Sequence, residues 1–234
     1  MKQYYIILCF LSIQTVALAQ NNTGIADDFK YLAMHNLNVN TSTISTFSNS
    51  TVKGSQYLYD KWTAGSVTTN ENVTYAVNYL FNFDKVNQNL YVKYTAQNDL
   101  TILLDKSTIK SFNIANHAFI NFPGNDPKLK NTFLEILVPD TAVRLYKSTS
   151  TKFVKFDPTN MMNLRTGNLS SEFVETVTYY TNLGSGELKK LSLSEGNIRK
   201  AFKAKSDKVD QYFDMIPNKE LDESVLVNLV RYLN

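Results

Sequence analysis

The spacing of apolar residues changes once along this chain of 234 residues, and that change strongly constrains its fold. From Gln56 to Leu193 apolar and polar residues alternate in short runs, as in strands with one buried face. After Ser194 apolar residues recur every three or four positions, as in amphipathic helices. The 14 Tyr and 14 Phe residues also favour pleated, half-buried surfaces. The sequence therefore predicts an α+β fold, with a mainly antiparallel β-sheet and a small C-terminal helical segment.

The clearest predicted strand covers residues 73–83, where Tyr, Val and Phe occupy every second position. Further strand patterns follow at spacings of roughly 8–12 residues, which is typical of an antiparallel meander, an open barrel or a sandwich. These patterns cover residues 90–94, 100–104, 109–114, 132–138, 141–146, 172–180 and 187–193. Residues 147–170 are less regular, and we expect them to contain a long loop.

Three helices are expected from about residue 194 onward. Ser194 and Ser206 are suited to cap the first two, because a serine hydroxyl can accept a hydrogen bond from the first helical turn. The third covers residues 222–233 and carries an apolar stripe that must be buried, formed by Val225, Leu226, Leu229, Val230 and Leu233.

Residues 1–19 have the three parts of a secretory signal peptide. Lys2 gives the positive start, an apolar stretch follows, and residues 17–19 read Ala-Leu-Ala, the small-x-small form that signal peptidase cleaves. The apolar stretch is shorter than the roughly 20 residues that span a bilayer, and no second run of spanning length follows. The sequence thus predicts an exported protein, periplasmic or at the cell surface, with no transmembrane span in the mature chain.

The mature chain is expected to contain no cysteine, since the single cysteine, Cys9, lies in the predicted signal peptide. Disulfides, a thiol nucleophile and cysteine-based metal sites are then excluded. Residues 20–53 form a polar leader rich in Asn, Thr and Ser, and residues 54–234 are expected to form one β-rich domain.

Charge and histidine content argue against several classes of function. A net charge of +3 is too small to indicate binding to nucleic acid. The two histidines, His35 and His117, lie far apart in the sequence, and nothing signals a metal centre. No phosphate-binding loop occurs either. We therefore expect no cofactor and no metal.

Several short segments resemble a group of uncharacterised exported proteins common in Bacteroidetes-type bacteria. They include residues 54–62 (GSQYLYDKW), 65–67, 83–84, 90–93, 104–105, 109–112, 179–180, 188–191 and 229–234. The resemblance covers most of residues 54–234. It implies export and this style of fold, but it implies no reaction and no catalytic residue.

Two surface features follow from the sequence. Tyr57, Tyr59 and Trp62 could form an aromatic surface for a glycan or a peptide, or they could fix an edge strand to the sheet. Residues 140–142, Asp-Thr-Ala, match a short O-glycosylation pattern of exported proteins in such bacteria, which marks Thr141 as a candidate acceptor.

Three functions remain open. The preferred hypothesis is a non-enzymatic periplasmic or cell-surface protein that binds or supports an envelope protein, a glycan or a lipid. The second is an exported hydrolase, which requires that two of Asp84, Asp105, His117 and Glu135 meet in a cleft. The third is a carrier that encloses an apolar ligand between the sheet and the last helix.

Export gives the first testable prediction. The protein isolated from its source cells should begin at Gln20, because cleavage follows the Ala17-Leu18-Ala19 motif. Replacing Ala19 by Arg should leave the precursor uncleaved, whereas Ala19→Ser should be processed normally. Intact-mass spectrometry separates the two forms, and a wild-type chain that keeps its first 19 residues would contradict the prediction.

Overall fold

An open sheet of twelve strands dominates this computed structural model, which describes residues 52–95, 101–122, 126, 129–130, 132–139, 142–159, 170–184 and 187–234. The strands are β1 (Val52–Lys53), β2 (Thr63–Thr69), β3 (Thr74–Tyr75), β4 (Tyr79–Asp84), β5 (Asn89–Tyr94), β6 (Thr101–Leu103), β7 (Ile109–Ile114), β8 (His117–Asn121), β9 (Phe133–Val138), β10 (Arg144–Val154), β11 (Ser171–Asn182) and β12 (Lys189–Leu191). The helices are α3 (Glu195–Ala201), α4 (Ser206–Met215) and α5 (Glu223–Leu233), with short 3-10 turns η1 (Lys106–Thr108) and η2 (Lys203–Lys205).

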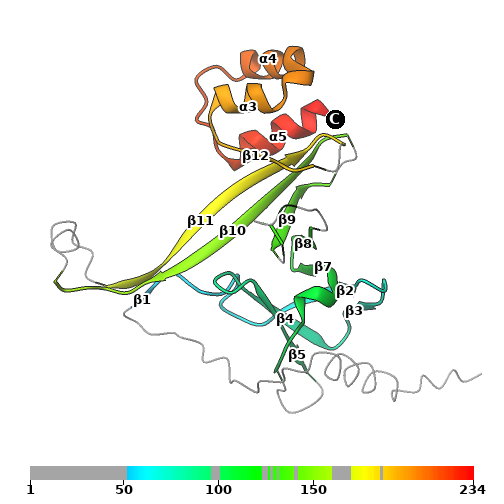
Figure 1. Ribbon diagram of the computed structural model, residues 1–234, viewed down its shortest axis with the longest axis vertical. Coiled ribbons are helices and arrows are strands. Elements are labelled where there is room, and N and C mark those ends of the chain that lie inside the picture. Colours follow the sequence, from blue (N-terminus) through cyan, green and yellow to red (C-terminus); the bar gives the residue numbers. More distant parts are fainter. Residues whose placement is uncertain are drawn as a thin grey trace, which may run out of the picture.

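The strand order is β1-β11-β10-β9-β8-β7-β2-β4-β5-β6, with β12 also paired to β11 and β3 to β2. All pairs are antiparallel except β1–β11, which is parallel. The predicted antiparallel sheet followed by C-terminal helices is therefore confirmed (Figure 1).

Strand β2 joins two meanders, β4–β6 and β7–β11, and changes partner along its length. Thr63 and Ala64 pair with β4, and the remaining residues of β2 pair with β7. Gly65 stands at this change. A Cβ atom there would lie 2.2 Å from the carbonyl oxygen of Asn113, so only glycine permits the close approach of the two backbones.

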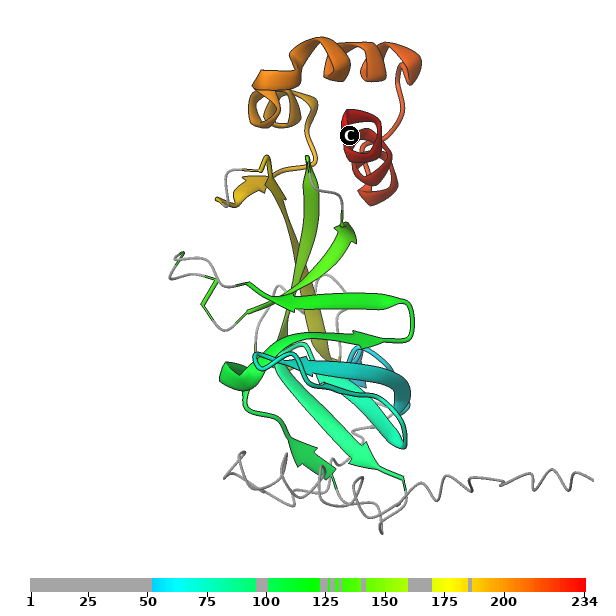
Figure 2. The ribbon, with the colours of Figure 1, turned by 90° about the vertical axis from the view of Figure 1, so that its right-hand side faces the viewer.

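Aromatic side chains fill the first core, between β4–β5 and β7–β9. Phe83 contacts Phe112, Phe119 and Phe133, with ring centroids 5.4–5.9 Å apart. Phe112 and Phe119 stack at 4.6 Å across the β7–β8 pair. These contacts between distant strands show that the sheet bends around its own aromatic face, as Figure 2 also shows.

The three helices cover the other end of the sheet and form a second core with it. Every residue of the predicted α5 stripe is buried, and the stripe packs with Val138 of β9 and Leu145 of β10. Asp222 caps α5 by accepting a hydrogen bond from the backbone N–H of Val225 at 2.9 Å. The change of period near Ser194 thus marks the boundary between sheet and helices.

Three local predictions were wrong. Residues 73–83 do not form one strand, because a turn at Val77 and Asn78 separates β3 from β4 and leaves Val77 71% exposed. Ser206 is the first residue of α4 and not its cap. Residues 147–154, part of the segment expected to be irregular, continue β10 without interruption. Continuous pairing with β11 explains the length of β10, and it involves residues far away in sequence.

The glycines provide a matched test of the fold. Gly65→Ala should lower the free energy of unfolding by about 1–3 kcal/mol, because the added methyl group collides with the backbone of β7. Gly196→Ala should instead stabilise the protein by about 0.5–1 kcal/mol, since its Cβ meets nothing within 4 Å and it lies in α3. Urea denaturation measures both changes, and equal effects would contradict this account of β2.

Candidate functional site

The aromatic segment predicted as a binding surface runs along the edge of β4. The backbone N–H of Leu58 donates to the carbonyl of Phe83 at 2.9 Å, and Tyr57 forms a β-bridge with Asp84. The side chain of Asn82 donates to the carbonyl of Tyr59 at 2.9 Å. These bonds attach the segment to the sheet, which is the structural role considered for it.

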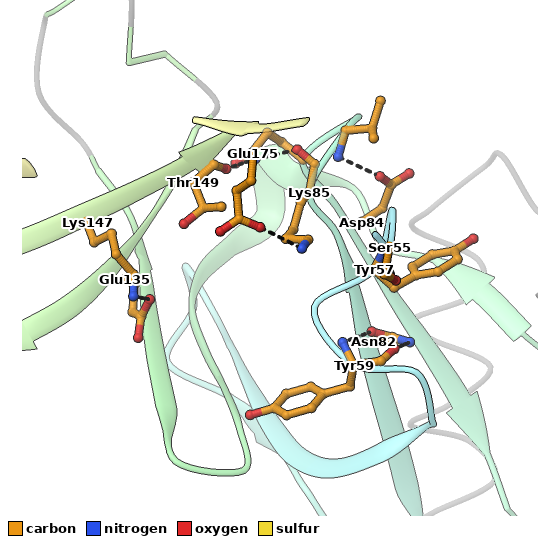
Figure 3. A network of polar contacts seen from close by, with 12 residues as sticks. Ser55, Tyr57, Tyr59, Asn82, Asp84, Lys85, Glu135, Lys147, Thr149 and Glu175 are labelled. Carbon is orange, nitrogen blue, oxygen red and sulfur yellow. Dashed lines mark hydrogen bonds and ion pairs between the residues drawn. The ribbon is translucent and has the colours of Figure 1, made fainter. Parts of the chain in front are cut away.

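The rings of this segment do not gather on one surface. Figure 3 shows Tyr57 and Tyr59 pointing in opposite directions. Tyr57 contacts Tyr91 edge-on at 6.4 Å, whereas Tyr59 packs against the first core and contacts the ring of His117 at 6.0 Å. Trp62 is half-buried just before β2. Partial burial raises the pKa of Tyr57 to about 12, with smaller contributions from Tyr91 and Asp84, so its phenol stays protonated at neutral pH.

Asp84 and Asp105 organise turns. The fully buried carboxylate of Asp84 accepts hydrogen bonds from the backbone of Val86, from the backbone and side chain of Asn87, and from the side chain of Gln56. Asp105 caps η1 by accepting from the backbone of Ser107. Both carboxylates thus satisfy nearby donors, as is usual for Asp at turns.

The other two hydrolase candidates do meet. Nδ1 of His117 lies 2.5 Å from a carboxylate oxygen of Glu135, across the β8–β9 pair. Glu135 is 8% exposed, so its charge requires partners. The second partner is Lys147 of β10, whose Nζ lies 2.9 Å from the other carboxylate oxygen of Glu135 (Figure 3).

Lys147 extends this contact to the helical end of the molecule. Its Nζ also lies 3.3 Å from a carboxylate oxygen of Glu223 in α5, and the hydroxyl of Tyr179 donates to Glu223 at 2.9 Å. We call His117, Glu135, Lys147, Tyr179 and Glu223 the polar seam. The seam ties β8, β9, β10 and β11 to the first turn of α5.

Strand alternation explains where the seam lies. Phe133, Glu135 and Leu137 point to one face of β9, because side chains two residues apart share a face. Phe133 belongs to the first core, and Leu137 packs against the second. Glu135 therefore lies between the two apolar clusters, and the seam separates them.

The seam holds Lys147 charged. Burial opposes the ammonium charge, but the hydrogen bond and the charge of Glu135, together with Glu223, outweigh burial and raise the pKa of Lys147 above its usual 10.5. Partial burial, and then Glu223, raise the pKa of Tyr179. A protonated Lys147 between two carboxylates is an electrostatic clamp, and it is not a nucleophile at neutral pH.

Among the described residues, no hydroxyl or amine nucleophile is hydrogen-bonded to His117. The carboxylate that orients His117 is shared with Lys147. The same described ranges contain no group of three or more His, Cys, Asp or Glu placed to hold a metal ion. What the contacts of Lys147 and Tyr179 with Glu223 do directly is position α5 on the sheet.

A shallow depression of about 460 Å³ adjoins the seam on α5. Its lining residues are Asp222, Glu223, Ser224, Val227, Asn228 and Arg231. Five of these six residues are polar or charged, but most of the exposed lining surface is apolar, so the depression specifies no class of ligand.

The seam itself was not predicted, although two of its members, His117 and Glu135, were candidates. Alternation gives the face of each residue within its strand, but the pairing of distant strands decides which residues meet. Some predicted features lie outside the described residues. These are the signal peptide and most of the leader, which with His35 fall in residues 1–51, and the candidate acceptor Thr141.

Comparison with known proteins gives no relative: no family model, no curated protein and no solved structure matches this chain. Within the described part of the chain, no helix has both the length and the apolar character needed to cross a membrane.

The clamp predicts strong coupling between two substitutions. Lys147→Met should lower the free energy of unfolding by about 3 kcal/mol, because it leaves Glu135 buried without its cation. Adding Glu135→Gln to that variant should recover about half of the loss, since the buried charge is removed as well. Urea denaturation provides the measurement.

Glu223→Gln is the matched control, because the side chain of Glu223 is 40% exposed and the change should cost less than about 1 kcal/mol. If the double variant is as unstable as the sum of its two single variants, the seam does not act as a clamp.

Proposed function

We propose that this protein is an exported, non-enzymatic protein of the cell envelope that binds a protein partner through the far part of its β10–β11 hairpin. This part, which we call the arm, consists of residues 148–154 and 171–178. Its base lies just beyond Lys147, the last residue of β10 that pairs with β9, and Tyr179, the first residue of β11 that pairs with β12. Figure 1 shows the arm projecting away from the helices and past the remaining strands.

Exposed apolar side chains on the arm support this proposal most directly. Phe153 is 50% exposed, Val154 46%, Val174 41% and Val177 40%. Phe153 also contacts Phe173 of the opposite strand, with ring centroids 5.1 Å apart. Single exposed apolar residues are common, but here each face of one projecting hairpin carries two, Phe153 with Val177 and Val154 with Val174, which favours an interaction element.

The base of the arm is braced, so its surface is presented in a fixed position. Lys85, in the turn between β4 and β5, forms an ion pair with Glu175 at 2.7 Å. In the same turn Gln88 donates to the carbonyl of Thr149 at 2.9 Å. A surface that is already ordered loses less conformational entropy on binding.

An exported hydrolase is the second candidate, and the contact of His117 with Glu135 is the observation that favours it. Since Lys147 shares that carboxylate, we rank it below the binding function. The carrier of an apolar ligand ranks last, because the buried side chains of the second core occupy the space between the sheet and α5.

Photo-crosslinking in the source cells tests the binding function. A photoreactive amino acid at Phe153 or Val174 of the full-length chain should yield a discrete protein adduct in the envelope fraction. The same amino acid at Met215 is the control, because Met215 is 58% exposed but lies on α4. His117→Gln should leave the adduct unchanged if binding needs no catalysis.

Three results would contradict the proposal: no protein adduct from either arm position, equal adducts from Met215, or adducts with lipid or glycan alone. The last result would direct the search to those ligands instead.

A further inference from the structure

The outer edge of β11 is occupied by another strand at each of its two ends. On this edge β1 pairs with Ser171 and Glu172, and β12 pairs with Tyr179, Tyr180 and Thr181. Between them, no strand of the described residues pairs with residues 173–178, which we call the window. At about 3.3 Å per residue the window is roughly 20 Å long.

The outward backbone groups of the window follow from contacts on the other side of the hairpin. The N–H of Thr151 donates to the carbonyl of Lys85, away from β11, and the carbonyl of Thr149 accepts from Gln88. In an antiparallel pair, the N–H and C=O groups of one residue point to the same side of its strand. Two residues that face each other across the pair direct these groups either both toward the partner strand or both away from it. Glu175 and Val177, the partners of Thr151 and Thr149, therefore direct their N–H and C=O groups to the open edge.

Gly54 is the residue that ends β1 and leaves the window open. Its φ of +77° turns the chain away from β11, and a Cβ atom there would lie 2.9 Å from the carbonyl oxygen of Phe173. This conformation and this close approach both require glycine. The chain that follows crosses to β4, so β1 stops after two residues.

We propose that the window binds a short extended peptide segment of the partner protein, which adds a strand to the sheet between β1 and β12. This inference rests on the proposed function and specifies how the partner binds. The window contains no Pro, Gly or Lys, and it pairs with β10 without a bulge. Apart from the charge of Glu175, it therefore lacks the usual features that protect an edge strand from pairing.

The flanking strands exclude a second copy of the same edge. Strand β11 is 12 residues long and pairs with β10 over 11 of them without a change of register. A second β11 laid along the window would run into β1 or β12, which occupy the same edge at its two ends. Because Gly54 lies against the carbonyl of Phe173, only a short segment that pairs with Glu175 and Val177, and whose ends leave the sheet, fits this space.

Side chains of the window specify the chemistry of that segment. Val174 and Val177 lie on opposite faces of the strand and are both exposed, so they favour β-branched or other apolar neighbours on either face. Glu175 is the one charged residue of the window, and Lys85 already pairs with it. The segment that fits is thus uncharged and rich in β-branched residues, and it pairs mainly through its backbone.

Proline at Val177 tests the backbone contact. Octapeptides selected from a random phage library on the full-length chain are the probes, and fluorescence anisotropy measures their affinity. Val177→Pro removes an N–H that faces the edge and leaves the bonds to β10 intact, so affinity should fall at least about tenfold. Val177→Thr, the matched control, keeps the N–H and should bind within about twofold of wild type.

Amide hydrogen exchange of the wild-type chain is the second measurement and needs no variant. The selected peptide should slow exchange of the Glu175 and Val177 amides at least about tenfold. The Thr176 amide faces β10 and should change little. Selection of no peptide, equal binding to Val177→Pro, or unchanged exchange at Glu175 and Val177 would each overturn strand addition.

Failure of this inference differs from failure of the proposed function. If arm crosslinks form in cells and persist in Val177→Pro, the partner binds the arm without adding a strand. If no arm position yields a protein adduct, the binding function itself falls.

Discussion

The uninterrupted ladder between β10 and β11 is the interaction on which the rest of this structure depends. It pairs 11 residues of β10 without a change of register. At one end it carries Leu145 and Tyr179 into the core beneath the helices, and in the middle it carries Lys147 to Glu135. Its far end forms the arm. A slip of one residue would turn every one of these side chains to the opposite face.

The polar seam costs free energy of desolvation, and it sets the position of α5 on the sheet. Glu135 lies between two apolar clusters and is desolvated, so the ion pair with Lys147 mainly offsets the penalty of burying the charge. Because the partners come from four strands and one helix, their contacts are satisfied together in only one arrangement of α5 on the sheet. The seam thereby fixes the helical end relative to the sheet.

The aromatic residues show how far a sequence pattern can locate a surface. The group at Tyr57, Tyr59 and Trp62 suggested an exposed cluster, but the segment is bonded to β4 and its tyrosines point apart. The exposed Phe153 instead belongs to a strand in a segment whose sequence pattern is irregular. In both cases exposure depends on which strand lies alongside, and local sequence does not contain that information.

The sequence by itself determined the class of the fold, the order of most elements and the buried stripe of α5, because periods of two and of 3.6 residues are local properties of the chain. Only the tertiary structure decided that β2 changes partner at Gly65, that Glu135 meets both His117 and Lys147, and that the outer edge of β11 has no described strand beside it between β1 and β12. Each of these features joins residues that are distant in sequence, and strand pairing with side-chain packing selects them only when the whole sheet has formed.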